Sequence, residues 1–185
     1  MATSETQIYQ LKVTLRGLRP PIWRRIQVAG DITLYELHLV LQATMGWANY
    51  HLYQFTINGI HYGEPHPDDW YDIVDVRKTR LNAVASEAGS KFLYEYDFGD
   101  GWEHEIKLEK ILPPEAGQRY PVCITGRRAC PPEDCGGVWG YADLLEIIQD
   151  PKREEHDEML EWLGGELDPE AFDLDEINQV LQRSR

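Results

Sequence analysis

The chain has 185 residues, of which 42% are hydrophobic, and a formal net charge of −14 at pH 7. A chain of this length can bury a sizeable core without disulfide bonds, so we expect one domain spanning 1–185. It contains no run of about 18 apolar residues, which argues against a membrane-spanning helix, and its polar start lacks the pattern of a signal peptide. These features together predict a cytoplasmic protein.

The charge is unevenly distributed along the sequence. Residues 1–30 hold five basic residues and one acidic residue, whereas residues 141–185 hold fourteen acidic and four basic residues. A nucleic-acid binder needs a basic face, so the overall acidity argues against nucleic acid as the main ligand. The basic start instead predicts contacts with carboxylates of an acidic protein or peptide partner, because guanidinium groups grip carboxylates with two hydrogen bonds. The residues concerned are Arg16, Arg19, Arg24 and Arg25.

The first third of the chain predicts strands and one helix. Alternating apolar and polar residues indicate strands at 8–16 and 22–28. Thr33 and Glu36 form a capping box for an amphipathic helix at 34–45. Strands at 51–57 and 60–63 then flank an Asn-Gly turn, which is typical of a tight hairpin. The order strand, strand, helix, strand, strand is similar to a β-grasp fold.

The rest of the chain extends this sheet and then becomes helical. A polar loop at 64–78 and a short helix at 81–89 precede two strands, at 91–98 and 102–112. From residue 141 onward the apolar residues recur at helical spacing. We therefore expect an α+β domain with a mixed, β-grasp-like sheet packed on one amphipathic helix. Its parts are a sheet and helix core at 1–112, a cysteine, proline and glycine loop at 113–140, and an acidic C-terminal helical cap at 141–185.

Four separated motifs carry a family resemblance. They are PPIWRRI (20–26), YDFGDGWEHEI (96–106), RACPPEDCGG (128–137) and HDEMLEWLGGELDPEAFDLDEIN (156–178). With them the chain resembles the plasmid pRiA4b ORF-3-like family over nearly its whole length. The resemblance implies an uncharacterised protein of plasmids, mobile elements and chromosomes, and it brings no catalytic residues. Some members carry a resolvase label, but this chain has no basic recognition helix for DNA, so we reject recombination.

The cysteine loop is a candidate metal site. Cys123, Cys130 and Cys135 have the spacing C-x6-C-x4-C, and their odd number argues against a closed disulfide framework. Three thiolates with His104 or His156 as fourth ligand would form a tetrahedral zinc site. Two alternatives stay open: small buried residues that pin the loop, or a nucleophilic thiolate at Cys135 near the start of a helix.

The 94–106 hairpin and the 130–137 loop together form the predicted functional site. The leading hypothesis is a binding or adaptor module for a protein or peptide partner, since aromatic side chains supply rigid contact area. Its hairpin residues are Tyr96, Phe98 and Trp102. The alternative hypothesis is a hydrolase, with Asp97, Asp100, Glu133 or Asp134 acting as acid or base together with His104. A nucleic-acid accessory factor is the third hypothesis. For Asp97, a purely structural role is the alternative to catalysis, in which its carboxylate accepts hydrogen bonds from backbone amides of the turn.

Overall fold

The computed structural model describes residues 6–183, which form one sheet and five helices. The strands are β1 (Ile8–Leu15), β2 (Ile22–Ala29), β3 (Tyr53–Ile57), β4 (Ile60–Gly63), β5 (Val74–Asp75), β6 (Lys91–Tyr96), β7 (Trp102–Leu112) and β8 (Val122–Arg127). The helices are α1 (Leu34–Met45), α2 (Leu81–Val84), α3 (Gly137–Gln149), α4 (His156–Leu163) and α5 (Leu174–Arg183). None of the helices within this range is long and apolar enough to cross a membrane.

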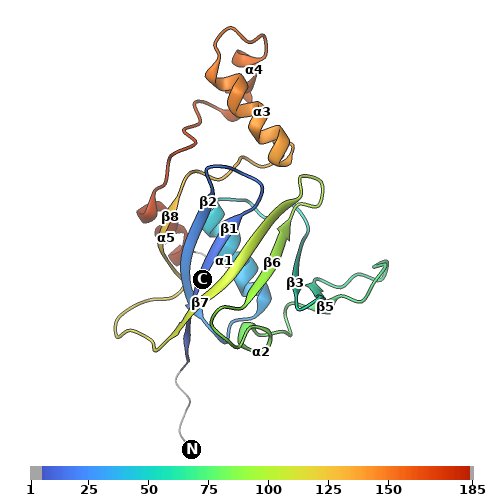
Figure 1. Ribbon diagram of the computed structural model, residues 1–185, viewed down its shortest axis with the longest axis vertical. Coiled ribbons are helices and arrows are strands. Elements are labelled where there is room, and N and C mark those ends of the chain that lie inside the picture. Colours follow the sequence, from blue (N-terminus) through green and yellow to red (C-terminus); the bar gives the residue numbers. More distant parts are fainter. Residues whose placement is uncertain (1–5, 184–185) are drawn as a thin grey trace, which may run out of the picture.

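The eight strands lie in the order β5-β4-β3-β6-β7-β1-β2-β8 (Figure 1). Neighbouring strands are antiparallel except for β4 and β5, which are parallel, so the sheet is mixed. The predicted α+β class, with a mixed sheet, a packed helix and a helical C-terminus, is confirmed.

Helix α1 covers the buried face of the sheet and has the predicted bounds. Thr33 Oγ1 accepts from the backbone N–H of Glu36, while the Glu36 carboxylate accepts from the backbone N–H of Thr33, which completes the capping box. The helix ends at Gly46, which adopts φ +83°, a conformation that glycine tolerates. Its buried residues include Leu37 and Leu41, both fully enclosed in the core.

Three segments differ from the prediction. The 113–140 segment contains strand β8 and the first residues of α3, because β8 pairs with β2 and the helix begins at Gly137. The polar 64–78 loop contains the two-residue strand β5. Helix α2 stops at Val84 rather than reaching residue 89, because the chain then turns to place the Gly89 N–H on the Leu108 carbonyl of β7.

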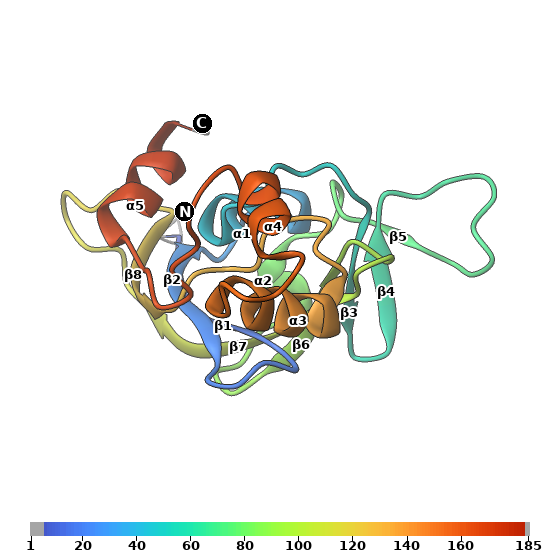
Figure 2. The ribbon, with the colours of Figure 1, turned by 90° about the horizontal axis from the view of Figure 1, so that it is seen from above.

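The C-terminal helices occupy two places. Helices α3 and α4 pack together beyond one end of the sheet, and α5 lies beside β8 and α1 (Figures 1 and 2). The side chain of Asn178 on α5 both donates to the Cys123 carbonyl, at 2.9 Å, and accepts from the Cys123 N–H, at 2.8 Å. Asp173 accepts from the Glu176 N–H at 2.9 Å and so caps the start of this helix.

Candidate functional site

Three segments that are distant in the sequence meet at the end of the sheet below α3. They are the 46–52 connection that leads into β3, the 97–101 turn between β6 and β7, and the 130–136 loop that precedes α3. The second and third of these belong to the two motifs from which the sequence predicted a site. The first was not predicted to take part.

The 130–136 loop is fastened to the 46–52 connection. Trp47 Nε1 donates to the Pro131 carbonyl at 3.0 Å. One carboxylate oxygen of Glu133 accepts from the Ala48 N–H at 2.7 Å and from the Tyr96 hydroxyl at 3.0 Å. Because the ring of Trp47 and the hydroxyl of Tyr96 belong to buried side chains, the loop rests on fixed partners.

The 97–101 turn is fastened to the same loop from the other side. Asp97 adopts φ +57°, and its Oδ1 accepts from the Gly99 and Asp100 N–H groups, at 3.0 and 3.3 Å. The prediction that Asp97 bonds backbone amides of the turn is confirmed. Asp100 in turn accepts from the Gly136 N–H at 3.2 Å. A Cβ atom on Gly137 would collide with the Asp100 carbonyl, so only glycine permits this close approach.

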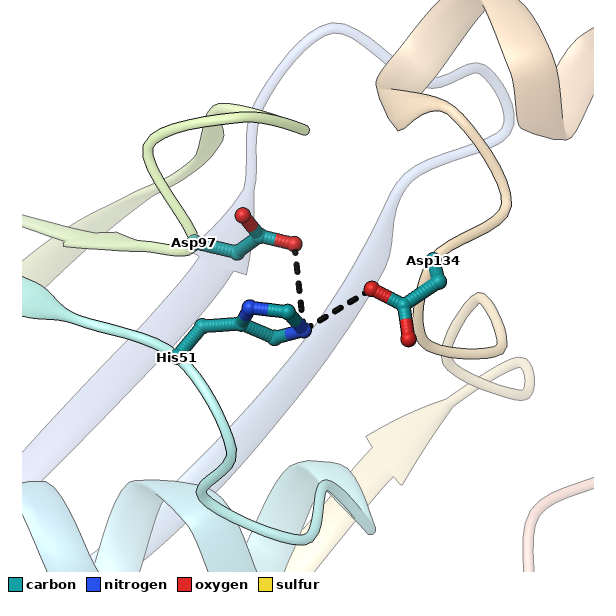
Figure 3. A group of neighbouring side chains, drawn as sticks. All are labelled: His51, Asp97 and Asp134. Atoms are coloured by element: carbon teal, nitrogen blue, oxygen red, sulfur yellow. Dashed lines mark ion pairs between the residues drawn. The ribbon is translucent and has the colours of Figure 1, made fainter.

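His51, Asp97 and Asp134 converge where these segments meet (Figure 3). His51 Nε2 lies 2.8 Å from Asp134 Oδ1 and 3.6 Å from Asp97 Oδ2. The cluster is open on one side, because the Asp97, His51 and Asp134 side chains are 10%, 30% and 64% exposed. Sequence reasoning placed His51 in a strand at 51–57. The strand begins only at Tyr53, and no local pattern signals that His51 faces two aspartates.

The predicted acid–base residues are divided between this cluster and the core. Asp97 and Asp134 contact His51, whereas Asp100 and Glu133 hold the segments together. His104 is fully buried on β7, with Nδ1 3.1 Å from the Tyr94 carbonyl, and burial lowers its pKa to about 4. The structure thus brings together carboxylates from the two predicted motifs, Asp97 and Asp134. The histidine that they contact is His51 and not the predicted His104.

The predicted aromatic residues are also divided. Tyr96 and Trp102 are buried, whereas Phe98 is 49% exposed at the tip of the turn. Tyr50 and Leu52, on either side of His51, are exposed as well. Exposed apolar side chains therefore neighbour His51 and Asp97 in the chain, and Phe98 is the one residue of the predicted three among them.

A groove of about 600 Å³ runs from His51 along β3 to the 64–73 loop. Its lining includes the carboxylates of Glu64, Asp68 and Asp69 and the imidazoles of His51 and His66, and its exposed apolar lining includes Leu52, Tyr71 and Phe98. Neither lysine nor arginine lines it. The groove is therefore acidic and partly aromatic.

The four N-terminal arginines do not form one exposed face. Arg24 is buried, and its guanidinium donates to the backbone carbonyls of Trp23, at 2.9 Å, and Arg127, at 3.0 Å. Arg16 and Arg19 are exposed at the β1–β2 connection. A partner could therefore reach Arg16 and Arg19, whereas the Arg24 guanidinium serves the interior.

Arg25 forms a bidentate ion pair with Glu109, at 2.7 and 3.0 Å, and this hydrogen bonding holds the Glu109 pKa at about 2. Replacing Glu109 by glutamine is expected to lower the free energy of unfolding at pH 7 by about 2 kcal/mol. Because the folded pKa lies below the ordinary 4.5, this stabilisation is present above pH 4.5 and is lost as the pH falls towards 2.

Urea denaturation at pH 7 checks this prediction, with Glu103→Gln as the matched control. Glu103 pairs with Arg16 through one contact at 3.0 Å, and both side chains are about half exposed, so its loss should cost less than about 1 kcal/mol. Equal losses from the two variants would contradict the role given to burial and bidentate geometry.

The three cysteines lie in different surroundings. Cys123 faces the core from β8, Cys130 Sγ is 3.5 Å from Met45 Sδ, and Cys135 precedes α3. Burial raises the pKa of Cys123 and Cys130 to about 11 and that of Cys135 to about 12, so the thiols stay protonated at neutral pH.

Within residues 6–183, the cysteines and histidines of the predicted zinc site do not come together as a group of three ligands. The residues that do so are His51, Asp97 and Asp134. Of the two predicted fourth ligands, His104 lies in the core and His156 lies on α4 beside Asp157. The possible cation ligands that lie together are therefore those of the His51 cluster and not the cysteines.

Comparison with known proteins relates the chain to one family and to proteins that include the two described below. The sequence pattern described as Plasmid pRiA4b ORF-3-like protein matches residues 7–176. Uncharacterized protein y4hQ of Sinorhizobium fredii is 42% identical over 177 residues, which cover 94% of this chain and 90% of that protein. The crystal structure of a protein of unknown function, MM3350 from Methanosarcina mazei Go1, is similar with a TM-score of 0.84 and 39% identity, over 94% of this chain and 98% of that one.

Proposed function

Because the chain belongs to the plasmid pRiA4b ORF-3-like family, and both relatives are of unknown function, we propose its function from the site itself. We propose a binding module that recognises a basic segment of a protein partner. The recognition site is the groove between His51 and the 64–73 loop. The observation that carries this proposal is the combination of acidic and aromatic side chains in one open groove.

The size and lining of the groove support recognition of a few side chains. Its volume of about 600 Å³ lies within the range of about 300–1,000 Å³ that ligand sites occupy. Phe98 and Tyr71 both line the groove and are about half exposed. Aromatic side chains of this kind supply much of the binding energy at protein interfaces.

The charge of the groove supports a basic partner rather than the acidic one predicted from the N-terminal arginines. Asp68 and Asp69 lie at its rim, and Glu64 pairs there with Arg77 at 2.8 Å. A lysine or arginine of the partner can pair with these carboxylates and stack on an aromatic ring. The arginine surface is weaker than predicted, since Arg24 is enclosed.

Fluorescence anisotropy with labelled peptides of arginine, lysine and glycine tests the proposal. The basic peptide is expected to bind, more weakly as salt rises, while a matched glutamate peptide does not. The double variant Asp68→Asn/Asp69→Asn should weaken binding about three- to tenfold, because two exposed charge pairs are lost. Phe98→Ala should weaken it at least tenfold.

Two controls separate groove binding from general attraction to an acidic protein. Glu158→Gln/Glu161→Gln removes the same charge from α4, and Trp139→Ala removes an aromatic side chain that is 87% exposed on α3. Neither should change the affinity. If the α4 variant weakens binding as much as the groove variant does, the peptide is held by net charge alone and the proposed site is wrong.

A further inference from the structure

We infer that His51, Asp97 and Asp134 form a binding site for a divalent transition-metal ion. The three residues come from three separate segments, and their ligand atoms all lie within 4.8 Å of one another. The ion site rests on the positions of these ligand atoms, whereas the peptide site proposed above rests on the lining of the groove.

The spacing of the ligand atoms fits coordination to one ion. Metal bonds of about 2.1 Å from imidazole nitrogen and carboxylate oxygen place neighbouring ligand atoms about 3.0 Å apart in octahedral geometry and about 3.4 Å apart in tetrahedral geometry. The distances from His51 Nε2 to Asp134 Oδ1 and Asp97 Oδ2 are 2.8 and 3.6 Å. Small side-chain adjustments would therefore suffice.

The direction of the histidine nitrogen distinguishes this arrangement from an ordinary ion pair. His51 Nε2 is enclosed, and it makes no hydrogen bond with residues 6–183. Asp134 Oδ1 lies only 2.8 Å from this nitrogen, yet the contact is not a hydrogen bond, which also needs the acceptor near the axis of the nitrogen. In Figure 3 the two carboxylates flank the nitrogen. The axis of this nitrogen is thus left for a ligand that both carboxylates can share.

Both aspartates are held by contacts that leave an oxygen for the ion. The two backbone N–H groups of Gly99 and Asp100 occupy Oδ1 of Asp97, so Oδ2 is the atom that points to His51. The neighbour of Asp134, Glu133, is bonded to Ala48 and fixes the loop that presents Asp134. Supporting contacts of this type orient the ligands of metal sites.

The ligand set selects the class of ion. One imidazole nitrogen with carboxylate oxygens suits Zn²⁺, Fe²⁺ or Mn²⁺, whereas Mg²⁺ and Ca²⁺ prefer oxygen alone. Three protein ligands leave at least one position for water or for a group of a bound ligand. His51 also lines the groove, so such a position would face whatever the groove holds.

Isothermal titration calorimetry with ZnCl₂, MnCl₂ and MgCl₂ on the metal-free full-length protein tests the inference. One Zn²⁺ per chain is expected, bound more tightly than Mn²⁺, with Mg²⁺ weakest. His51→Ala and Asp134→Asn should each weaken Zn²⁺ binding at least about tenfold. Asp134 is largely exposed, so the Asp134→Asn variant keeps the fold, which circular dichroism verifies.

Controls and an optical measurement decide between this site and the cysteines. His156→Ala and Asp175→Asn remove an imidazole on α4 and an exposed carboxylate on α5, both outside the groove, and neither should change Zn²⁺ affinity. With Co²⁺ in place of Zn²⁺, nitrogen and oxygen ligands give weak visible bands without strong thiolate charge-transfer absorption. Binding that survives in both the His51 and Asp134 variants, a thiolate band, or no stoichiometric binding would each overturn the inference. The titrations contain no peptide, so a negative result leaves the proposed groove function standing.

Discussion

Lowering the pH from 6.5 to 4 is expected to remove about 6 kcal/mol from the free energy of unfolding, which is comparable to the total stability of many domains. The cause is a pair of buried imidazoles, His38 and His104, whose pKa values burial lowers from 6.5 to about 4. Each ring contributes about 3 kcal/mol, since one pKa unit corresponds to about 1.4 kcal/mol.

The sign of the effect follows from which state takes up protons. Above pH 6.5 both rings are neutral in the folded and the unfolded chain, so neither carries a penalty. Below pH 6.5 the unfolded chain becomes protonated while the folded one does not, until the pH approaches 4. Stability is therefore complete above pH 6.5 and falls through this window.

The contacts of His38 explain why the folded state resists its protonation. Tyr94 Oη accepts from Gln42 Nε2 at 2.9 Å and can then donate its own proton to His38 Nδ1, 2.8 Å away. The other nitrogen donates to Asn49 Oδ1, also at 2.8 Å. A second proton on the ring would place two donors against each other inside the core.

Urea denaturation followed by tryptophan fluorescence at pH 7, 6, 5 and 4 measures the effect. His104→Gln removes one titrating ring and keeps a donor for the Tyr94 carbonyl, so its stability should fall about half as steeply as that of the wild type. His66→Ala removes an exposed ring and should leave the pH dependence unchanged. Parallel curves for wild type and His104→Gln would refute the assignment to His104.

Replacing Gly137 by alanine is expected to cost about 3–4 kcal/mol and to separate the two motifs that form the site. The residue has φ +70°, which costs an L-residue about 1–2 kcal/mol. The new Cβ would also collide with the Asp100 carbonyl, and overpacking of this kind costs about 1–3 kcal/mol. Relief of the collision must move the 97–101 turn away from the loop that carries Asp134.

The matched control is Gly164→Ala at the end of α4. Gly164 has φ +72°, but a Cβ there meets no atom within 4 Å, so this variant carries the conformational cost alone. Urea denaturation should show the larger loss for Gly137→Ala, and Zn²⁺ titration should show weakened binding in that variant and unchanged binding in Gly164→Ala. Equal stability losses would mean that the close approach to Asp100 has no energetic weight.

Local signals allowed much of the fold to be predicted. The capping box defined α1 to the residue, and the Asn58-Gly59 turn fixed the β3–β4 hairpin, because each signal acts within a few residues. Strand β8 was missed because its stability comes from pairing with β2, about a hundred residues earlier, and its own alternation is short.

The sequence allowed the two carboxylates of the site, Asp97 and Asp134, to be predicted, but not its histidine, His51. The density of acidic residues in two glycine-containing motifs pointed to Asp97 and Asp134. His104 was a candidate for both the zinc site and the acid–base site, but the alternation of β7 turns it inward, and on a strand in the middle of a sheet an inward residue enters the core. His51 joins the site only through the tertiary arrangement of its loop, for which the sequence contains no periodic signal. The same alternation on β2 places Arg24 inward, between Ile22 and Ile26.

The two edge strands of the sheet, β5 and β8, restrict how another protein can attach. A chain can bind an exposed edge strand by adding a strand of its own, which needs a row of unused backbone groups. At one margin β5 offers only two residues. At the other, Asn178 already occupies both backbone groups of Cys123, and the Ala129 N–H just beyond β8 donates to the Pro169 carbonyl. Strand addition, the route that also leads to aggregation, is thus disfavoured at both margins, which favours attachment of a partner through side chains.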